Sequence, residues 1–282
     1  MSENCNRKWL QMITDESTKN LVEEHKGLYI QTINKTAPNG ETESIEMKGV
    51  DGVKSTSSTY KPFDLEIEML FRGIDKQDAD LFLFKLNSLF SLRKPYYIRH
   101  SDLPDIKYFV EPTPELDYEY VTPRDYNITV TFSCLKGYSE SYRATNQMSL
   151  SDGLWQFEEG LKADDEIKYV FTDWGYRIFN GSNDTINPFH HSLTIKLNLD
   201  APEGFTLKNK TTGDTFEYYE PLKRNTGFKI QDIYPIINLS ENVGRYSNFE
   251  WITLAPGWND IEITGRNLSY VKSEWIFNFI FK

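Results

Sequence analysis

The histidines are the first residues to examine for chemistry, because imidazole is a common metal ligand and general base. The chain has four of them, His25, His100, His190 and His191. Adjacent residues of a strand point to opposite faces, so His190 and His191 do not form a shared ligand pair, and the other two are far apart in sequence. We therefore expect no metal site.

The carboxylates are the second candidates for chemistry. Acidic pairs such as Glu158-Glu159 and Asp164-Asp165 have the residue types of the two carboxylates of a glycosidase. Acids are abundant along the whole chain, however, and a solvated surface explains these pairs better. The chain lacks the G-x-S-x-G, P-loop and G-x-G-x-x-G motifs of nucleophilic and nucleotide-binding sites. We predict a protein that is not an enzyme and that carries no cofactor.

A regular acidic pattern occurs in residues 63–72, which read FDLEIEMLFR. Asp64, Glu66 and Glu68 alternate with apolar residues, as in a strand with one buried face. One interpretation is the ordinary solvated face of an antiparallel sheet. The other is a surface that repels a negatively charged molecule, and the pattern alone leaves both open.

Four of the tryptophans, Trp155, Trp174, Trp251 and Trp258, fall in the second half of the chain. Sugar-binding β-sandwiches stack pyranose rings on such side chains, whereas most tryptophans of a sandwich are buried in its core. Trp174 and Trp258 are the candidates for sugar stacking.

Length and charge limit the possible functions. The chain has 282 residues, which favours two domains, and a net charge of −11, which argues against a nucleic-acid-binding or anionic-membrane-binding surface over most of the molecule. No apolar stretch of about 18 residues is present, and the N-terminus lacks the apolar region of a signal peptide. We expect folding in a cytosol, no membrane insertion, and free thiols at Cys5 and Cys134, although one disulfide remains possible.

One segment, residues 75–92, is a convincing helix. Asp75 is suited to the N-cap and Asp78 follows three residues later, while Pro95 terminates the segment. One broad arc of the helix carries the expected core residues Ala79, Phe82, Leu83, Leu86, Leu89 and Phe90. A second apolar patch, Leu81, Phe84 and Leu92, lies on the opposite side. It fits either a second layer of the same domain or a contact between subunits.

The rest of the chain is predicted to be mainly β. Residues 39–60 are polar and form a long loop or an extended hairpin, and residues 136–150 are a plausible linker. We place the domains at 1–140 and 141–282, the second being a β-sandwich of about 130 residues. The strand-like runs are 95–100, 107–112, 126–135, 193–199, 205–220, 250–254, 258–265 and 273–282, with a hairpin turn at 209–214 and with Trp275, Phe277, Phe279 and Phe281 on one face of the last run.

These segments together resemble the distal tail (Dit) proteins of long, non-contractile-tailed phages that infect Gram-positive hosts. The matching segments cover most of the chain in order, and the Gly-Trp-Asn sequence at 257–259 makes their combination specific. They are the turn Gly49-Val50-Asp51-Gly52, LFSLRKPYYIRHSDLP (89–104), KYFVEP (107–112), ITVTFSCLKGYS (128–139), NPFHHSLTIKL (187–197), GFTLKNKTTGDTFEY (205–218) and ITLAPGWNDIEITG (252–265).

The resemblance implies an N-terminal β-sandwich with one α-helix and an extended arm, followed by a galectin-like β-sandwich. In the family, six copies form a ring that joins the tail tube to the tip proteins responsible for host binding and cell-wall lysis. Residues 39–60 would be the arm that reaches a neighbouring copy. The interface candidates are therefore Gly49, Asp51 and Gly52 of the arm and Leu81, Phe84 and Leu92 of the helix.

The resemblance also offers a reason for the acidic strand. The tape-measure protein and then DNA pass through the ring, and a bore lined by Asp64, Glu66 and Glu68 would repel phosphate. The implied partners are identical copies, the tail tube protein, a lysin or tip protein and a receptor-binding protein, all at the distal end of the virion tail after assembly in the host cytoplasm. The alternative is a carbohydrate-binding adhesin whose C-terminal sandwich recognises host cell-wall saccharide.

Overall fold

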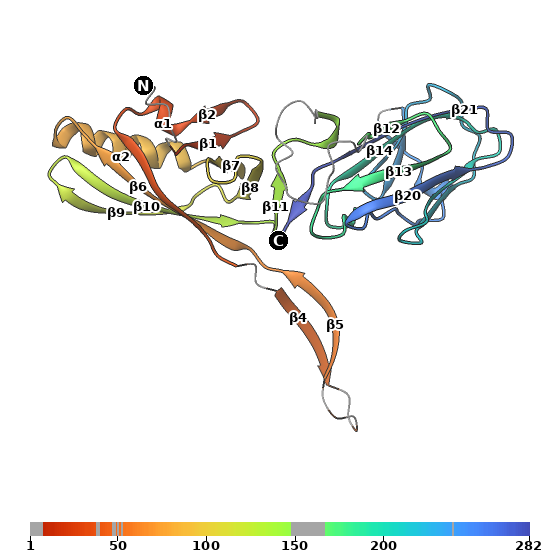
Figure 1. The fold of residues 1–282 in the computed structure, drawn as a ribbon, viewed down its shortest axis with the longest axis horizontal. Helices are drawn as coiled ribbons and strands as arrows, with labels where there is room; N and C mark the ends of the chain where they lie inside the picture. Colours follow the sequence, from red (N-terminus) through yellow and green to blue (C-terminus); the bar gives the residue numbers. More distant parts are fainter. Residues whose placement is uncertain are drawn as a thin grey trace. The chain divides into compact units, whose positions relative to one another are not determined.

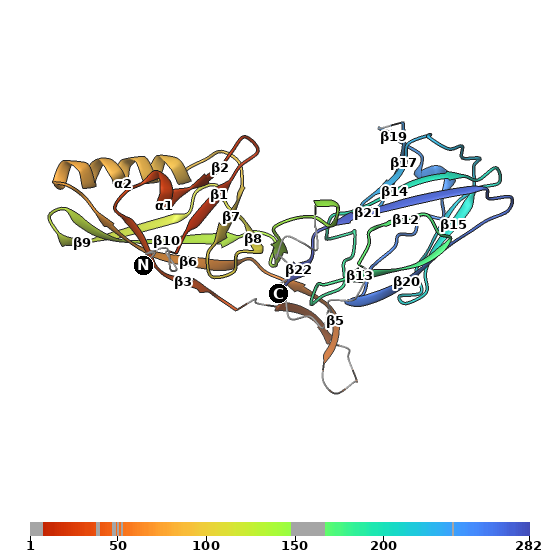
Figure 2. The same cartoon turned by 45° about the horizontal axis from the view of Figure 1, so that its top comes forward.

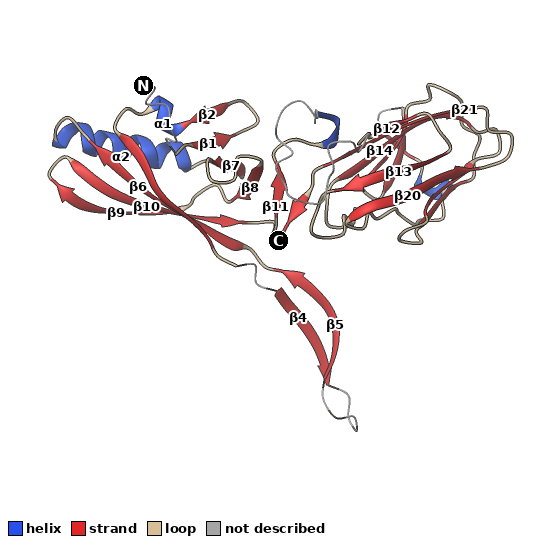
Figure 3. Ribbon diagram, in the orientation of Figure 1, coloured by secondary structure: helices blue, strands red, loops and turns tan. Residues whose placement is uncertain are grey.

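The computed structural model divides the chain into two compact units, Met1–Tyr142 and Arg143–Phe281. It describes residues 8–37, 40–46, 49, 51, 53–147, 167–238 and 240–282. Antiparallel strands dominate both units, so the expected mainly β fold is confirmed (Figures 1 and 3). Cys5, Trp155 and the acidic pairs at 158–159 and 164–165 lie outside the described residues. No helix of the described residues is long and apolar enough to span a membrane.

The first unit is an antiparallel sheet wrapped around a core, with one long helix. The sheet runs in the order β2-β1-β7-β8-β10-β6-β3, with β9 added to β10 and β11 to β8, while β4 and β5 pair with each other. The elements are β1 (Leu10–Ile13), β2 (Thr18–Asn20), α1 (Leu21–Glu24), β3 (Leu28–Lys35), β4 (Gly40–Glu46), β5 (Val53–Tyr60), β6 (Phe63–Arg72), α2 (Lys76–Phe90), β7 (Tyr96–His100), β8 (Ile106–Val110), β9 (Glu115–Thr122), β10 (Asp125–Cys134) and β11 (Ser139–Ser141).

Helix α2 begins where the sequence predicts it. The Asp75 carboxylate accepts a hydrogen bond from the Asp78 backbone N–H at 2.8 Å, and the Asp78 carboxylate accepts one from Ile74 N–H at 2.9 Å. These bonds satisfy N–H groups that a helix start leaves without partners. The short helix α1 was not predicted, because it has only four residues, and it is capped by Asn20.

One side of α2 lies on β6 and β10 (Figures 1 and 2). Phe82 stacks on Phe71 with ring centroids 3.7 Å apart, and Phe90 meets Phe132 edge to face at 5.2 Å. The helix residues Ala79, Phe82, Leu86 and Phe90 are buried, as are the facing side chains of both strands. These contacts fix which face of β6 is internal.

The expected linker at 136–150 is corrected over its described part. Ser139, Glu140 and Ser141 are buried and form β11, which pairs with β8. The Glu140 carboxylate accepts a hydrogen bond from Tyr97 Oη at 2.7 Å and forms an ion pair with Lys136 Nζ at 2.8 Å. A polar segment can be internal when its charges are paired in this way, so residues 139–141 belong to the first unit, while the boundary between the two units, after Tyr142, falls within the predicted segment.

The second unit is a sandwich of two sheets, β12-β21-β14-β17-β18-β19 and β13-β20-β15-β16. Phe205 and Phe228 meet across the sheets edge to face at 5.5 Å, and Trp275 Nε1 donates to Tyr176 Oη at 3.1 Å. The elements are η1 (Thr145–Gln147), β12 (Val170–Phe171), β13 (Gly175–Asn180), β14 (Leu193–Asp200), β15 (Phe205–Asn209), β16 (Thr215–Tyr218), β17 (Phe228–Gln231), β18 (Tyr234–Ile237), β19 (Glu241–Asn242), η3 (Gly244–Tyr246), β20 (Gly257–Thr264), β21 (Tyr270–Phe277) and β22 (Ile280–Phe281).

Two strand predictions in this unit need correction. Residues 250–254 form only an isolated bridge at Leu254, because side chains bind this backbone: Asp214 Oδ2 accepts from Thr253 N–H at 2.8 Å. The final run is split between β21 and β22, since Ile280 N–H donates to Ser182 Oγ at 2.9 Å. Its four aromatic residues are nevertheless all buried. The turn predicted at 209–214 joins β15 to β16 and contains Gly213 with φ +88°.

Asn259, the last residue of the Gly-Trp-Asn sequence, is fully buried and binds the loop before β20. Its Oδ1 accepts from Ala255 N–H at 2.9 Å and from Asn209 Nδ2 at 3.0 Å, and its Nδ2 donates to Ala255 O at 2.8 Å. The side chain thus supplies partners that a buried loop backbone cannot obtain from water.

We predict that Asn259→Leu lowers the free energy of unfolding of the second unit by about 3 kcal/mol, because several buried polar groups lose their partners. Urea denaturation followed by tryptophan fluorescence measures the change. The control Asn34→Leu, at an exposed position of β3, should change stability by no more than about 0.5 kcal/mol. Equal effects of the two substitutions would contradict the assigned role.

His100 gives the first unit a dependence on pH. The ring is 3% exposed, stacks on Tyr108 at 5.5 Å, and its Nδ1 has no hydrogen-bond partner among the described residues. Burial lowers the pKa of His100 from 6.5 to about 4, with Asp102 opposing and Lys8 assisting the shift. Between these values the unfolded chain binds the proton more readily, so stability falls as the pH falls.

We predict that His100→Phe removes this contribution and flattens the decline in unfolding free energy between pH 6.5 and 4 by up to about 1.4 kcal/mol per pH unit. Urea titrations at several pH values measure the slope of the unfolding free energy against pH. A packing change caused by the substitution would shift the free energy equally at every pH and would leave this slope unchanged. The same substitution at exposed His190 should retain the wild-type slope. Parallel slopes for wild type and His100→Phe would rule the assignment out.

Candidate functional site

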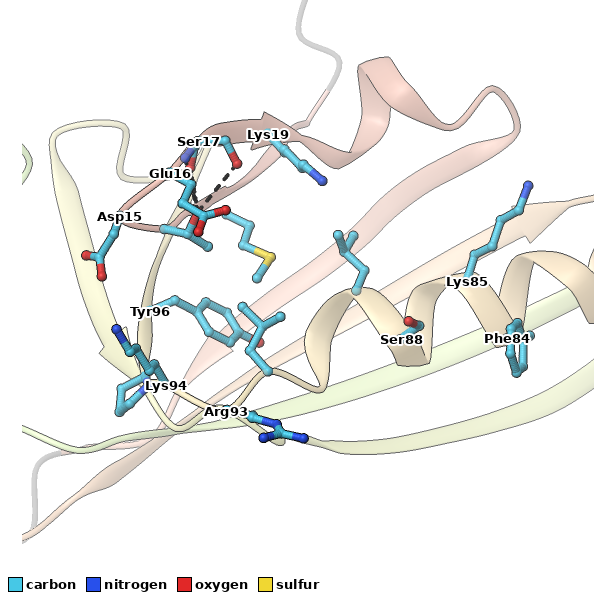
Figure 4. A pocket seen from close by; sticks show the side chains of 15 residues that line it. Asp15, Glu16, Ser17, Lys19, Phe84, Lys85, Ser88, Arg93, Lys94 and Tyr96 are labelled. Atoms are coloured by element: carbon cyan, nitrogen blue, oxygen red, sulfur yellow. Dashed lines mark hydrogen bonds between the residues drawn. The ribbon is translucent and has the colours of Figure 1, made fainter.

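The first unit contains an open groove of about 660 Å³ between α2 and the β1–β2 hairpin (Figure 4). Its apolar residues come from three elements, with Met12 on β1, Phe84 and Leu89 on α2, and Tyr96 at the start of β7. Met12 and Tyr96 are buried and form its floor. We call this feature the α2 groove.

The second apolar patch of the helix lies beside and within the α2 groove. Phe84 is 74% exposed, Leu81 49% and Leu92 36%. These side chains remain outside because the sheet packs on the opposite side of the helix, where Phe82 and Leu86 are buried. Of the two interpretations of the patch, the described residues favour a contact between subunits, because none of them buries these side chains as a second layer.

Charge surrounds the α2 groove. Lys19, Lys85, Arg93 and Lys94 line it together with Asp15 and Glu16 of the β1–β2 turn (Figure 4). None of the four cations forms an ion pair with a described residue. The groove is therefore locally cationic, whereas the net charge of the chain is −11.

Asp64, Glu66 and Glu68 lie on the outer face of β6, opposite its buried residues. On the neighbouring strands, Glu68 is opposite Thr129 of β10 and Thr32 of β3, and Thr32 Oγ1 donates to its carboxylate at 2.5 Å. Strand β6 is thus internal to the sheet, and its acids project from the middle of the sheet face.

A second acidic row on this face was not identified from the sequence. In β9, Glu115, Asp117 and Glu119 are opposite Thr131, Thr129 and Asn127 of β10, so they share the face of the β6 acids. The alternation in ELDYEYVT is the signal that could have revealed it. We call the six carboxylates together the acidic face: Asp64, Glu66, Glu68, Glu115, Asp117 and Glu119.

The predicted arm residues occupy the hairpin of β4 and β5. Gly49 and Asp51 lie in the connection between the two strands, both are exposed, and Gly49 has φ +91°. Gly52 lies outside the described residues. Among the described strands, β4 pairs only with β5 and β5 only with β4. The hairpin is therefore not part of the large sheet of the first unit.

The tryptophan candidates are both half-buried in the second unit. Trp258 lies on β20 against Phe179 at 5.3 Å, and the Arg177 guanidinium lies 4.9 Å from its ring centre. Trp174 precedes β13, and its carbonyl accepts from Ile263 N–H at 2.7 Å. Sequence analysis did not identify Phe189, which is 61% exposed and whose ring lies 5.8 Å from the ring of half-buried Trp251.

Buried titratable groups of the described residues serve packing. Cys134 is a buried free cysteine, and burial raises the pKa of its thiol to about 12, so a reactive thiolate is disfavoured at neutral pH. Within the described part of the chain, no group of three or more His, Cys, Asp or Glu side chains is placed to hold a metal ion.

Comparison with known proteins agrees with these features. Residues 22–134 match the model of the phage tail protein RIFT-related domain. No curated protein matches the chain. Among solved structures, the Dit (gp 19.1) protein of phage SPP1, described as a paradigm of the hub adsorption apparatus in Gram-positive infecting phages, is 14% identical, with a TM-score of 0.65, over 96% of this chain and 99% of that chain.

The activated baseplate of phage P2 also matches at 10% identity in two forms. The calcium form covers 96% of this chain and 98% of that chain with a TM-score of 0.47, and the strontium form covers 97% and 98% with a TM-score of 0.45. The matched domain contains α2, β6 and β9, which carry most of the α2 groove and the acidic face. The chain thus contains a segment, residues 22–134, that matches a phage tail protein RIFT-related domain, and its fold is like that of SPP1 Dit.

Proposed function

We propose that this phage tail protein is a structural hub at the distal end of the tail, where six copies close into a ring. The ring joins the tail tube protein to the tip proteins, including a lysin and a receptor-binding protein, and its role is not enzymatic. The tape-measure protein and DNA pass through it without specific binding. The fold shared with SPP1 Dit supports this function, and the observation that carries it is the uncovered apolar side of α2.

The uncovered side of α2 supports association because it contains large side chains. Burying one such side chain contributes about 1.5–3 kcal/mol, and an exposed apolar patch beside a groove marks an interaction site. A contact between unlike surfaces closes into a ring when the rotation between copies is a suitable fraction of a turn.

The β4–β5 hairpin is the second source of contacts in the proposed ring. A two-stranded hairpin alone is marginally stable in water, so a partner surface would stabilise it. We assign the exposed residues Gly49 and Asp51 of its connection, together with Gly52, to the contact with a neighbouring copy.

The β6 carboxylates of the acidic face, Asp64, Glu66 and Glu68, are assigned to the bore of the ring. Carboxylates at the centre of a sheet face, such as Glu66 and Glu68, disfavour phosphate approach, because DNA binding to proteins depends on cations that replace its counterions. A repelling bore allows a polyanion to pass without being retained.

We predict that reversing Asp64, Glu66 and Glu68 to lysine makes the assembled ring bind duplex DNA at low salt. The binding should weaken steeply as salt increases, because it depends on counterion release. Fluorescence anisotropy with a labelled duplex measures it, and the wild-type ring should not bind.

The matched control reverses Glu203, Glu220 and Glu250, which are exposed in loops of the second unit. It adds the same charge to a surface outside the proposed bore. Equal DNA affinity for the two triple variants would show that total charge, and not the acidic face, determines retention.

We predict that Phe84→Ser weakens self-association by about tenfold or more, because a central exposed aromatic residue is a typical interface anchor. Sedimentation velocity measures the oligomer distribution over a range of concentrations. The unfolding free energy of the first unit should change by less than about 0.5 kcal/mol, because the side chain is 74% exposed.

Phe189→Ser in the second unit is the control of the same residue type, at 61% exposure. It should leave the oligomer distribution unchanged. A Phe84→Ser variant that assembles like the wild type would remove the main support for the ring.

Binding of a saccharide by the second unit is the alternative function, and it stays a prediction. The exposed ring of Phe189, which lies beside half-buried Trp251, favours it more than the candidates Trp174 and Trp258, since an exposed ring face is needed for stacking on a sugar.

A further inference from the structure

We propose that the α2 groove of one copy receives the edge strand β9 of a second copy. The inference rests on the proposed ring and adds to it the identity of the two surfaces that meet. It concerns only the first unit, which contains both surfaces.

The α2 groove has the chemistry of a receptor for an acidic, partly apolar strand. Its floor contains buried Met12 and Tyr96, and Phe84 and Leu92 add exposed apolar surface along the helix side. The cations come from different sides, with Lys19 on β2, Lys85 on α2, and Arg93 and Lys94 after the helix. All four are exposed and have no ion-pair partner in the described part of the chain, so their charges are available.

Strand β9 has the matching chemistry. It pairs only with β10 among the described strands, which leaves the backbone groups of its other edge open. Glu115, Asp117 and Glu119 project from one face, while Tyr118 and Tyr120 project from the other, and both tyrosines are 54% exposed. One strand therefore presents carboxylates and large apolar side chains together, as the groove presents cations and apolar residues.

The two surfaces belong to different copies. No residue of β9 lines the groove of its own chain, and the register with β10 holds β9 in its own sheet over residues 115–122. Because the surfaces are unlike, each copy offers one of each and the contact is repeated head to tail, as a ring requires. Opposite charges then select the orientation and accelerate association.

The β4–β5 hairpin is the competing occupant, since β4 (GETESIE) also contains acids. We favour β9 because its described side chains supply both the charge and the exposed aromatic surface that the groove matches. The experiment below distinguishes the two.

The test is a charge exchange in the full-length chain. The groove variant carries Lys85→Glu and Lys94→Glu, and the strand variant carries Asp117→Lys and Glu119→Lys, all at exposed positions where folding should tolerate the change. Each double variant alone should weaken assembly by at least about tenfold, measured by mass photometry and sedimentation, because attraction becomes repulsion. The two double variants should associate with each other when mixed, and the chain with all four changes should regain assembly.

Lys208→Glu with Lys223→Glu, at exposed positions of the second unit, is the matched control and should assemble like the wild type. If neither double variant assembles more weakly than the wild type, the β9 contact is overturned, whereas the proposed ring is not. If both double variants lose assembly and the chain with all four changes does not regain it, the pairing of the groove with β9 is also overturned. A further chain combines the groove changes with Glu41→Lys, Glu43→Lys and Glu46→Lys instead of the β9 changes. If that chain regains assembly, the occupant of the groove is the hairpin and not β9. A wild-type chain that stays monomeric at high concentration overturns both the contact and the ring.

Discussion

The structure of the first unit depends on the packing of α2 against β6 and β10. The stacked pair Phe71–Phe82 holds the middle of the helix to the sheet, and the edge-to-face pair Phe90–Phe132 holds its C-terminal end. A helix can present only one side to a given sheet, and α2 is apolar on two sides. Once Phe82 and Phe90 are buried, Phe84 must point away from the sheet. The exposed patch is therefore a geometric consequence of the core and not a defect of packing.

The same packing determines the position of the acidic face. Successive side chains of a strand alternate between faces, so burying Leu65, Ile67 and Met69 places Asp64, Glu66 and Glu68 outside. The row of β10 between the two acidic rows consists of neutral Asn127, Thr129 and Thr131. Carboxylates of β6 and β9 are thus separated by two strand spacings, about 9–10 Å, which is near the screening length at physiological salt. This arrangement lets one sheet face carry six carboxylates at a tolerable cost in repulsion.

Sequence patterns predicted those features that local rules determine. The alternation in FDLEIEMLFR and the capping residues Asp75 and Asp78 correspond directly to β6 and α2. The errors occur where tertiary contacts replace local ones. Residues 250–254 have the composition of a strand, yet the side chains of Asp214 and Asn180 bind their backbone. The acidic row of β9 and the α2 groove were missed because both depend on which strands lie side by side, and composition does not contain that information.

The proposed ring raises a physical problem, which is how copies of an acidic chain could associate. Each copy has a net charge of −11, so bringing copies together costs electrostatic free energy that increases if their acidic faces converge on a common bore. Apolar burial alone would stabilise many orientations, including ones that bring acidic faces into contact. In the proposed ring, the cationic groove beside the apolar patch would resolve this difficulty, because it would offset the repulsion locally and only for the approach that places carboxylates over Lys19, Lys85, Arg93 and Lys94. The excess of acid would then act against every other orientation, and the overall charge would help to determine how copies meet.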